Sequence, residues 1–120
     1  MEKKNNIKNL LVDEKSSLRK IISVINSNRF GACFVTSKSK FKAVITDGDI
    51  RRLILRNHKL NKNICSFVNR KKSITASYLS SNLDILKKLS DKIKIIPILD
   101  AKKRILDFST IEKVKKINIY

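Results

Sequence analysis

The stretch FVTSKSKFKAVIT (residues 34–46) aligns without gaps, 64 positions later, with ILDAKKRILDFST (residues 98–110). Each copy contains an apolar run, a polar turn, a second apolar run and a final threonine. That order predicts a β-hairpin in each half of the chain. The strands expected to pair are residues 31–36 with 41–46 and residues 94–99 with 104–109.

Apolar residues at helical spacing precede each hairpin, and a serine stands before them as a candidate N-cap. In the first half these residues are Leu18, Ile21, Ile22 and Ile25, after Ser16 or Ser17. In the second half the weaker stripe is Leu83, Leu86 and Leu89, after Ser81. A further helix pattern follows each hairpin, with Ile50, Leu53 and Ile54 in the first half and Ile111 and Val114 in the second.

The chain is therefore predicted to be an α+β protein made of two β-α-β-β-α repeats. Short extended segments, Lys8–Val12 and Ile74–Ser77, supply the first strand of each repeat. The expected boundaries are 1–57 for the first repeat, 58–72 for a polar connector and 73–120 for the second repeat. Because a repeat of about 50 residues buries little core alone, the two are expected to pack through their sheets as a pseudo-two-fold pair.

Two further stretches, AVITDGDIRR (residues 43–52) and KIIPILD (residues 94–100), carry a family resemblance. Together with the duplication they resemble a tandem cystathionine-β-synthase (CBS) domain pair, the Bateman module, over about residues 8–116. The segment VITDGDIRR looks like the CBS pairs of sugar-phosphate isomerases and of sugar-nucleotide (NDP-sugar) nucleotidyltransferases. In the latter enzymes the pair precedes the catalytic domain.

In that family the pattern Gly-apolar-apolar-Thr/Ser-x-x-Asp holds the ribose of a nucleotide, most commonly an adenine nucleotide. The resemblance places Asp49 on the vicinal ribose hydroxyls and Thr46 on the ribose or phosphate. A carboxylate accepts two such hydrogen bonds in parallel, and negative charge is favoured near a helix N-terminus. The other ligand-binding residues implied are Val44, Ile45, Gly48, Gly31, Lys94, Ile95 and Arg51. AMP, ADP or ATP is the possible ligand, and no cofactor is assigned.

The second half departs from this pattern. Thr46 corresponds to Thr110, whereas Asp49 corresponds to Lys113, and a lysine cannot accept hydrogen bonds from ribose. The glycine that opens the family pattern is replaced in both halves, by Ala43 and by Asp107. At most one standard nucleotide site is expected.

The two carboxylates of TDGD (residues 46–49) admit other interpretations. Asp47 is expected to be the N-cap of the following helix, a role compatible with ribose binding by Asp49. A metal site on both is disfavoured, because their side chains diverge on entering a helix and no further acidic cluster lies nearby. Arg51 and Arg52 oppose the helix dipole in its first turn, which favours a partner or an anion near them.

The charge of the chain keeps another class of function open. Lysine and arginine number 28 against 10 aspartate and glutamate, a formal net charge of +18, and aromatic residues make up 6%. The basic residues are dispersed and not interleaved with aromatics, which favours a solvated surface over a nucleic-acid interface. A basic nucleic-acid-binding module and a ligand-free structural or dimerisation module remain the alternatives.

No pattern typical of catalysis is present, and no catalytic or metal-ligating residue is assigned. His58 lies alone in the connector, Cys65 has no evident base, and phosphate-binding glycine motifs are absent. Cys33, inside an apolar run, is expected to be a buried free thiol. Two cysteines, no signal peptide and no run near the ~20 apolar residues of a membrane span indicate a cytoplasmic protein.

The sequence therefore predicts a regulatory CBS pair, not an enzyme, that binds an adenine nucleotide at one cleft. We expect a homodimer formed through helices, with Ile50, Leu53, Ile54, Ile111 and Val114 at the contact. We also expect the chain to be the N-terminal piece of a longer protein, or a partner, that carries a nucleotidyltransferase for glycan precursors. Neither nucleic acid nor a membrane is an expected partner.

Overall fold

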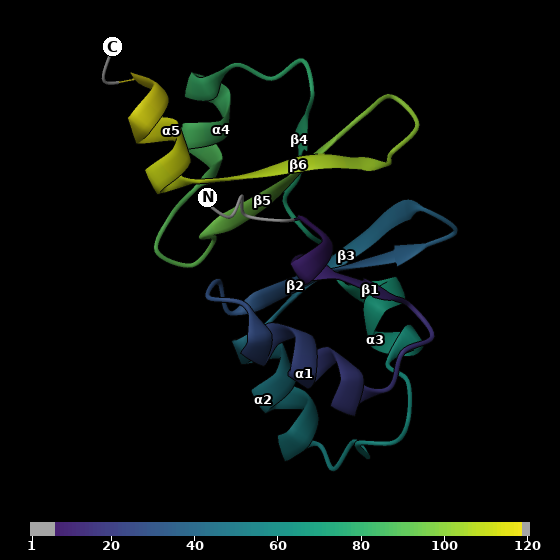
Figure 1. The fold of residues 1–120 in the computed structure, drawn as a ribbon. Coiled ribbons are helices and arrows are strands. Elements are labelled where there is room, and N and C mark those ends of the chain that lie inside the picture. The colour runs from purple at the N-terminus through teal and green to yellow at the C-terminus, as the bar shows by residue number, and fades with distance from the viewer. Residues whose placement is uncertain (1–6, 119–120) are drawn as a thin grey trace. The chain divides into compact units, whose positions relative to one another are not determined.

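The computed structural model describes residues 7–118, and their side chains as far as residue 115. The chain divides into two compact units, Met1–Lys72 and Ser73–Tyr120, each drawn in Figure 1 with its own sheet and helices. The segment 58–72 lies within the first of these units.

The first unit contains a three-stranded sheet in the order β1-β2-β3. β1 pairs parallel with β2, and β2 pairs antiparallel with β3. The segment expected to be extended from Lys8 begins instead as a 3₁₀ turn, and only its end is a strand. The elements are η1 (Ile7–Leu10), β1 (Leu11–Asp13), α1 (Leu18–Ser27), β2 (Ala32–Ser37), β3 (Lys40–Thr46), α2 (Asp47–Leu55) and α3 (Cys65–Arg70).

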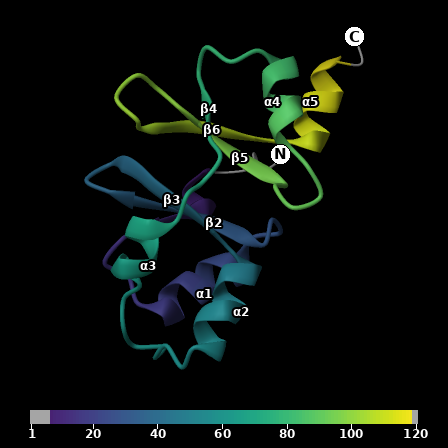
Figure 2. The same ribbon diagram turned by 180° about the vertical axis from the view of Figure 1, so that it is seen from behind.

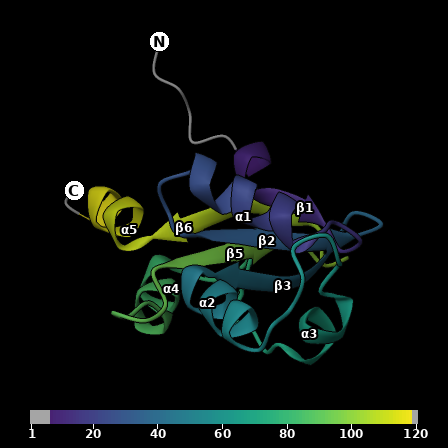
Figure 3. The ribbon, with the colours of Figure 1, turned by 90° about the horizontal axis from the view of Figure 1, so that it is seen from below.

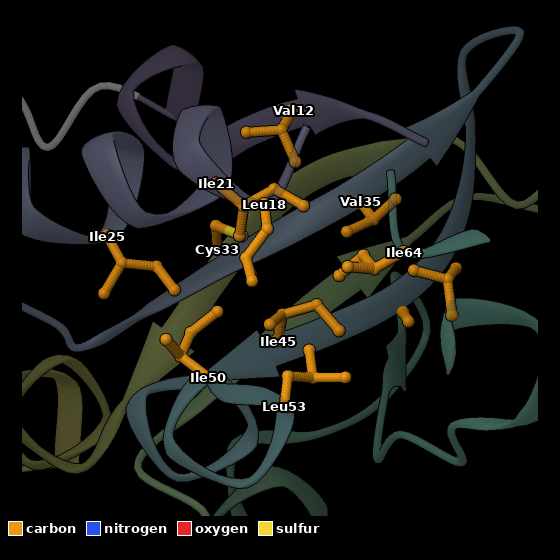
Figure 4. Packing of buried hydrophobic residues seen from close by; sticks show 12 residues of the cluster. Val12, Leu18, Ile21, Ile25, Cys33, Val35, Ile45, Ile50, Leu53 and Ile64 are labelled. Carbon is orange, nitrogen blue, oxygen red and sulfur yellow. The ribbon is translucent and has the colours of Figure 1, made fainter. Parts of the chain in front are cut away.

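Side chains from α1 and α2 share one core with inward residues of the sheet, as Figure 4 shows. The predicted stripe on α1 is confirmed, with Leu18, Ile21 and Ile25 buried and Ser17 as the N-cap. The polar connector also contributes, because Ile64 and Val68 are buried in the same core. Seen from below in Figure 3, α3 lies near β3.

The second unit repeats this plan with a sheet in the order β4-β5-β6. Ser81 caps α4 through a capping box with Asp84, which confirms the predicted N-cap. The apolar stripe of α4 differs from the prediction, because Ile85 is buried and Leu83 is 58% exposed. α4 and α5 lie side by side (Figure 2). The elements are β4 (Ala76–Ser77), α4 (Asn82–Lys88), β5 (Ile95–Leu99), β6 (Ile105–Thr110) and α5 (Ile111–Asn118).

The two hairpins are confirmed, but their equivalence is not gapless. Cys33 pairs with Ile45 in the first unit, and Ile96 pairs with Ser109 in the second. The positions of β3 and β6 are thus 64 residues apart, as the alignment had it, while those of β2 and β5 are 63 apart. The reason is the turn, which has one more residue in the second hairpin: residues 100–104 against residues 37–40.

The helix faces expected to form a dimer contact are mostly engaged within their own units. Ile50 and Leu53 belong to the core of the first unit and Val114 to that of the second, with Ile111 packed against it. Ile54 alone of the five is exposed, at 49%. The assignment of the whole stripe to a dimer contact was therefore wrong, because the apolar periodicity of these helices serves their own sheets.

Within residues 7–118, no helix is both long enough and apolar enough to cross a membrane.

Candidate functional site: the β3–α2 junction

The end of β3 and the start of α2 are joined by a reciprocal pair of hydrogen bonds. The hydroxyl of Thr46 accepts from the backbone N–H of Asp49 at 3.3 Å, and the carboxylate of Asp49 accepts from the backbone N–H of Thr46 at 2.9 Å. This is a capping box, which satisfies donors that a helix start leaves without partners. The prediction that Asp47 is the N-cap was wrong: Thr46 is the N-cap, and Asp47 is the first helical residue.

Asp49 is buried and surrounded by donors. Only 2% of the residue is exposed. One carboxylate oxygen, Oδ1, accepts from the guanidinium of Arg52 at 3.0 Å. The other, Oδ2, accepts from the backbone N–H and the hydroxyl of Thr46, and from the ammonium of Lys71. The junction is therefore a buried carboxylate paired with two cations.

These contacts decide the protonation of Asp49. Burial by itself raises the pKa of the carboxyl, because the charged form loses its hydration. The hydrogen bond from Lys71 and that from the Thr46 backbone, the charge of Lys71 and the bond from Arg52 outweigh burial. The net pKa of Asp49 lies below its ordinary value, so the side chain is an anion at neutral pH.

Lys71 is the residue that the sequence analysis missed at this site. It is the C-cap of α3, and its ammonium also donates to the backbone carbonyl of Val44 at 3.0 Å. The side chain is 23% exposed, against 3% for the side chain of Asp49. No local pattern marks this lysine, since it stands in a polar connector next to a second lysine, Lys72.

Gly31 and Gly48 have different roles. Gly31 has φ +67° at the start of the middle strand, and a Cβ there would lie 2.8 Å from the carboxylate of Asp47. Its carbonyl accepts from the backbone N–H of Asp47 at 3.0 Å, so this predicted residue does lie beside α2. At Gly48 a Cβ would meet only ordinary contacts, at 3.5 Å or more from side chains of Arg52 and Thr46. The fold itself does not require a glycine at position 48.

The structure brings some of the other predicted residues to the junction. Val44 and Ile45 are buried in β3, immediately before Thr46, and Arg51 is exposed in the first turn of α2. Lys94 and Ile95 belong to the second unit, where Lys94 is exposed and Ile95 is the buried first residue of β5. That Lys94 and Ile95 contribute to a ligand site stays a prediction made from the sequence.

The equivalent junction of the second unit has a different charge. The hydroxyl of Thr110 accepts from the backbone N–H of Lys113 at 3.2 Å, which confirms that Lys113 stands where Asp49 does. Its ammonium donates to the carbonyl of Phe108 at 2.6 Å and to the carboxylate of Asp107 at 3.3 Å. It also lies 4.2 Å from the centroid of the Phe108 ring. This junction offers a cation where the first unit offers an anion.

Neither Cys33 nor His58 is placed to act as a reactive group. Cys33 is a buried free thiol, as predicted, and burial followed by the charge of Asp49 raises its pKa to about 12. Such a thiol stays protonated and unreactive at neutral pH. The ring of His58 is hydrogen-bonded to the backbone carbonyl of Asn63. Over residues 7–118, no three His, Cys, Asp or Glu side chains are grouped so that they could hold a metal ion.

Comparison with known proteins adds the wider context. No family model matches the chain, and no curated protein matches it in sequence. Among solved structures, a CBS domain protein from Pyrobaculum aerophilum, complexed with AMP, is 16% identical with a TM-score of 0.69. The match covers 86% of this chain and 80% of that one. The chain has the fold of a CBS domain pair.

Two other solved structures agree with this fold. A CBS domain pair/ACT domain protein from Thermotoga maritima is 16% identical with a TM-score of 0.70, over 91% of this chain and 87% of that one. Staphylococcus aureus OpuCA is 17% identical with a TM-score of 0.72, over 90% of each chain. At such identities the likeness concerns the CBS pair fold.

Proposed function

We propose that this CBS pair senses an adenine nucleotide at the β3–α2 junction of its first unit. The observation that carries the proposal is the buried, ionised carboxylate of Asp49, held at a helix N-terminus beside the Thr46 hydroxyl. A carboxylate of this kind can accept hydrogen bonds from two vicinal hydroxyls of a ribose. The AMP complex of a protein with the same fold supports the choice of ligand.

The proposed site uses the groups around that carboxylate. Val44 and Ile45 supply backbone groups for the base, because the side chain of Ile45 is part of the hydrophobic core of the unit. Gly48 leaves the first turn of α2 open to the ligand, which explains a glycine that the fold does not need. Arg51, exposed in the same turn, is the candidate partner of the phosphate.

The second unit is proposed to lack an equivalent site. Its junction presents the ammonium of Lys113, which already donates to a carbonyl and a carboxylate. An ammonium has donors only and cannot receive the ribose hydroxyls. One nucleotide per chain is the expected stoichiometry.

Titration of the chain with AMP, ADP and ATP tests the proposal, with thermal melting and calorimetry as measurements. We expect saturable stabilisation by at least one nucleotide at one site per chain. The variant Gly48→Ala places a methyl group on the proposed ligand face without straining the fold, and we expect it to weaken binding at least tenfold. Glu112→Ala, at the corresponding position of the second unit, is the matched control and should bind like the wild type.

A 30-mer of RNA or DNA belongs in the same titration. Binding of that oligomer with a steep dependence on salt, together with no response to adenine nucleotides, would favour a polyanion-binding module instead. No response to any of these ligands would leave a structural or dimerisation role and would refute the sensing proposal.

The regulated enzyme is proposed from the sequence resemblance of VITDGDIRR. We infer that the module controls an attached or partner nucleotidyltransferase in the synthesis of NDP-sugar precursors, and that it acts as a dimer. The test is the rate of NDP-sugar formation by the enzyme with and without this module and the nucleotide. A rate that never responds to the nucleotide would refute this assignment. Sedimentation of the module alone measures its oligomeric state.

A further inference from the structure

Lys71 reaches the Asp49 carboxylate from outside the β3–α2 junction. It ends α3, where its backbone N–H donates to the carbonyls of Phe67 at 2.9 Å and Val68 at 3.2 Å. Its ammonium crosses to β3 and bonds both the Val44 carbonyl and Asp49. The capping box does not include Lys71, so the junction can keep its shape when this side chain leaves.

The second unit shows that the position is a preferred place for a cation. Through the register of the two hairpins, Phe108 in β6 corresponds to Val44 in β3. The carbonyl of Phe108 accepts from Lys113, and that of Val44 accepts from Lys71. A lysine ammonium thus donates a hydrogen bond to the equivalent backbone carbonyl in both units. In the second it is built into the helix, and in the first it arrives on a separate segment.

The number of hydrogen bonds that the Asp49 carboxylate can accept decides which donors a ribose must displace. Each carboxylate oxygen has two lone pairs. Oδ2 already receives two donors from Thr46 and one from Lys71, while Oδ1 receives Arg52. Two parallel bonds from a ribose need one free lone pair on each oxygen. Oδ1 has one to offer, but Oδ2 has none until Lys71 withdraws and the Thr46 hydroxyl turns away from it.

We propose that Lys71 is a built-in competitor of the ribose for Asp49, and that nucleotide binding releases it. The inference rests on the nucleotide site proposed above. Because Lys71 ends α3 and Lys72 is the last residue of the first unit, release alters the segment that leads into the second unit. Nucleotide binding is in this way coupled to the conformation of the segment at Lys71 and Lys72.

The competition sets the affinity. A ligand that binds only the fraction of molecules with Lys71 withdrawn has its apparent dissociation constant raised by the inverse of that fraction. Removing the ammonium abolishes this penalty, although it takes a partner from a buried carboxylate. The variant should therefore be less stable without ligand and bind the ligand more tightly.

Calorimetric titration of Lys71→Met with AMP, ADP and ATP is the test, because methionine keeps an apolar stem and loses the charge. We expect a lower melting temperature without ligand and a dissociation constant about tenfold lower than that of the wild type. The control is Lys72→Met, which removes the same charge from an exposed side chain with no hydrogen bond or ion pair to residues 7–118. It should bind like the wild type.

The outcomes separate this inference from the proposed function. Nucleotide binding by the wild type with equal or weaker binding by Lys71→Met would overturn the competition and leave the site standing. Failure of both proteins to bind any nucleotide would overturn both proposals. Binding by the variant alone would support both.

Two further measurements cover a Lys71→Met chain that fails to fold. Lys71→Gln keeps a donor for the Val44 carbonyl without the charge, and a smaller gain in affinity is expected. In the wild type, saturation with nucleotide should speed backbone hydrogen exchange at residues 68–71 while α1 exchanges no faster. Unchanged or slower exchange at residues 68–71 in a nucleotide-bound chain would contradict the release of Lys71.

Discussion

The strand–helix junctions of the two units have the same backbone and opposite charge. In each, a threonine hydroxyl accepts from the backbone N–H three residues later, at Asp49 and at Lys113. Asp49 is buried among two cations, whereas the Lys113 side chain is 34% exposed and bonded to backbone and carboxylate oxygens. The comparison shows that the fold fixes the capping geometry of both junctions. The side chain three residues after the threonine, Asp49 or Lys113, decides the charge of each junction.

The largest expected effect comes from removing the buried anion. Asp49→Ala leaves the ammonium of Lys71 without its carboxylate and breaks the capping box, so we expect a loss of about 3 kcal/mol in the free energy of unfolding. Urea denaturation measures it. Lys113→Ala is the matched variant of the second unit and should cost about 1 kcal/mol or less, because its ion pair is exposed. Equal losses in the two variants would remove the asymmetry described here.

The two glycines of the first unit should respond in opposite directions. Gly31→Ala forces a positive φ on a residue with a Cβ and brings that atom against the Asp47 carboxylate, at an expected cost of about 2 kcal/mol. Gly48→Ala meets no close contact in a helix and should stabilise by about 0.5 kcal/mol. Denaturation midpoints of the two variants test this, and a destabilised Gly48→Ala would contradict the open face at that residue.

Acid should have the smallest effect, and it should act through Asp49. Because the folded pKa of Asp49 is depressed, its contribution to stability is complete above the unfolded value near 3.8 and is lost as pH falls through the folded value. Melting temperatures between pH 7 and pH 2 should therefore fall less steeply below pH 4 in Asp49→Asn than in the wild type. An unchanged acid slope in that variant would show that the carboxylate is not stabilised by folding.

Much of the fold could be predicted because its signals are local. Ser17 and Ser81 precede helical stripes and cap α1 and α4, and the short apolar runs become the two hairpins. The predictions failed where local patterns are ambiguous. Asp47 and Thr46 are both good N-caps, and the capping box with Asp49 decides between them. Leu83 has the spacing of a core residue, but Ile85 is buried on α4 instead.

The sequence by itself determined the duplication, the strand and helix order, and the loss of an acceptor at Lys113. Each of these depends on residues close together in the chain or on the repeat of one sequence pattern along it. Only the tertiary structure decided that Lys71, 22 residues beyond Asp49, bonds to it. The structure also decided that equivalent residues of β2 and β5 are 63 positions apart, one fewer than the spacing of the sequence repeat. The physical reason is that an ion pair across the fold depends on how α3 packs against β3, and a strand register depends on which residues pair across the hairpin. Neither can be read from one short stretch of residues.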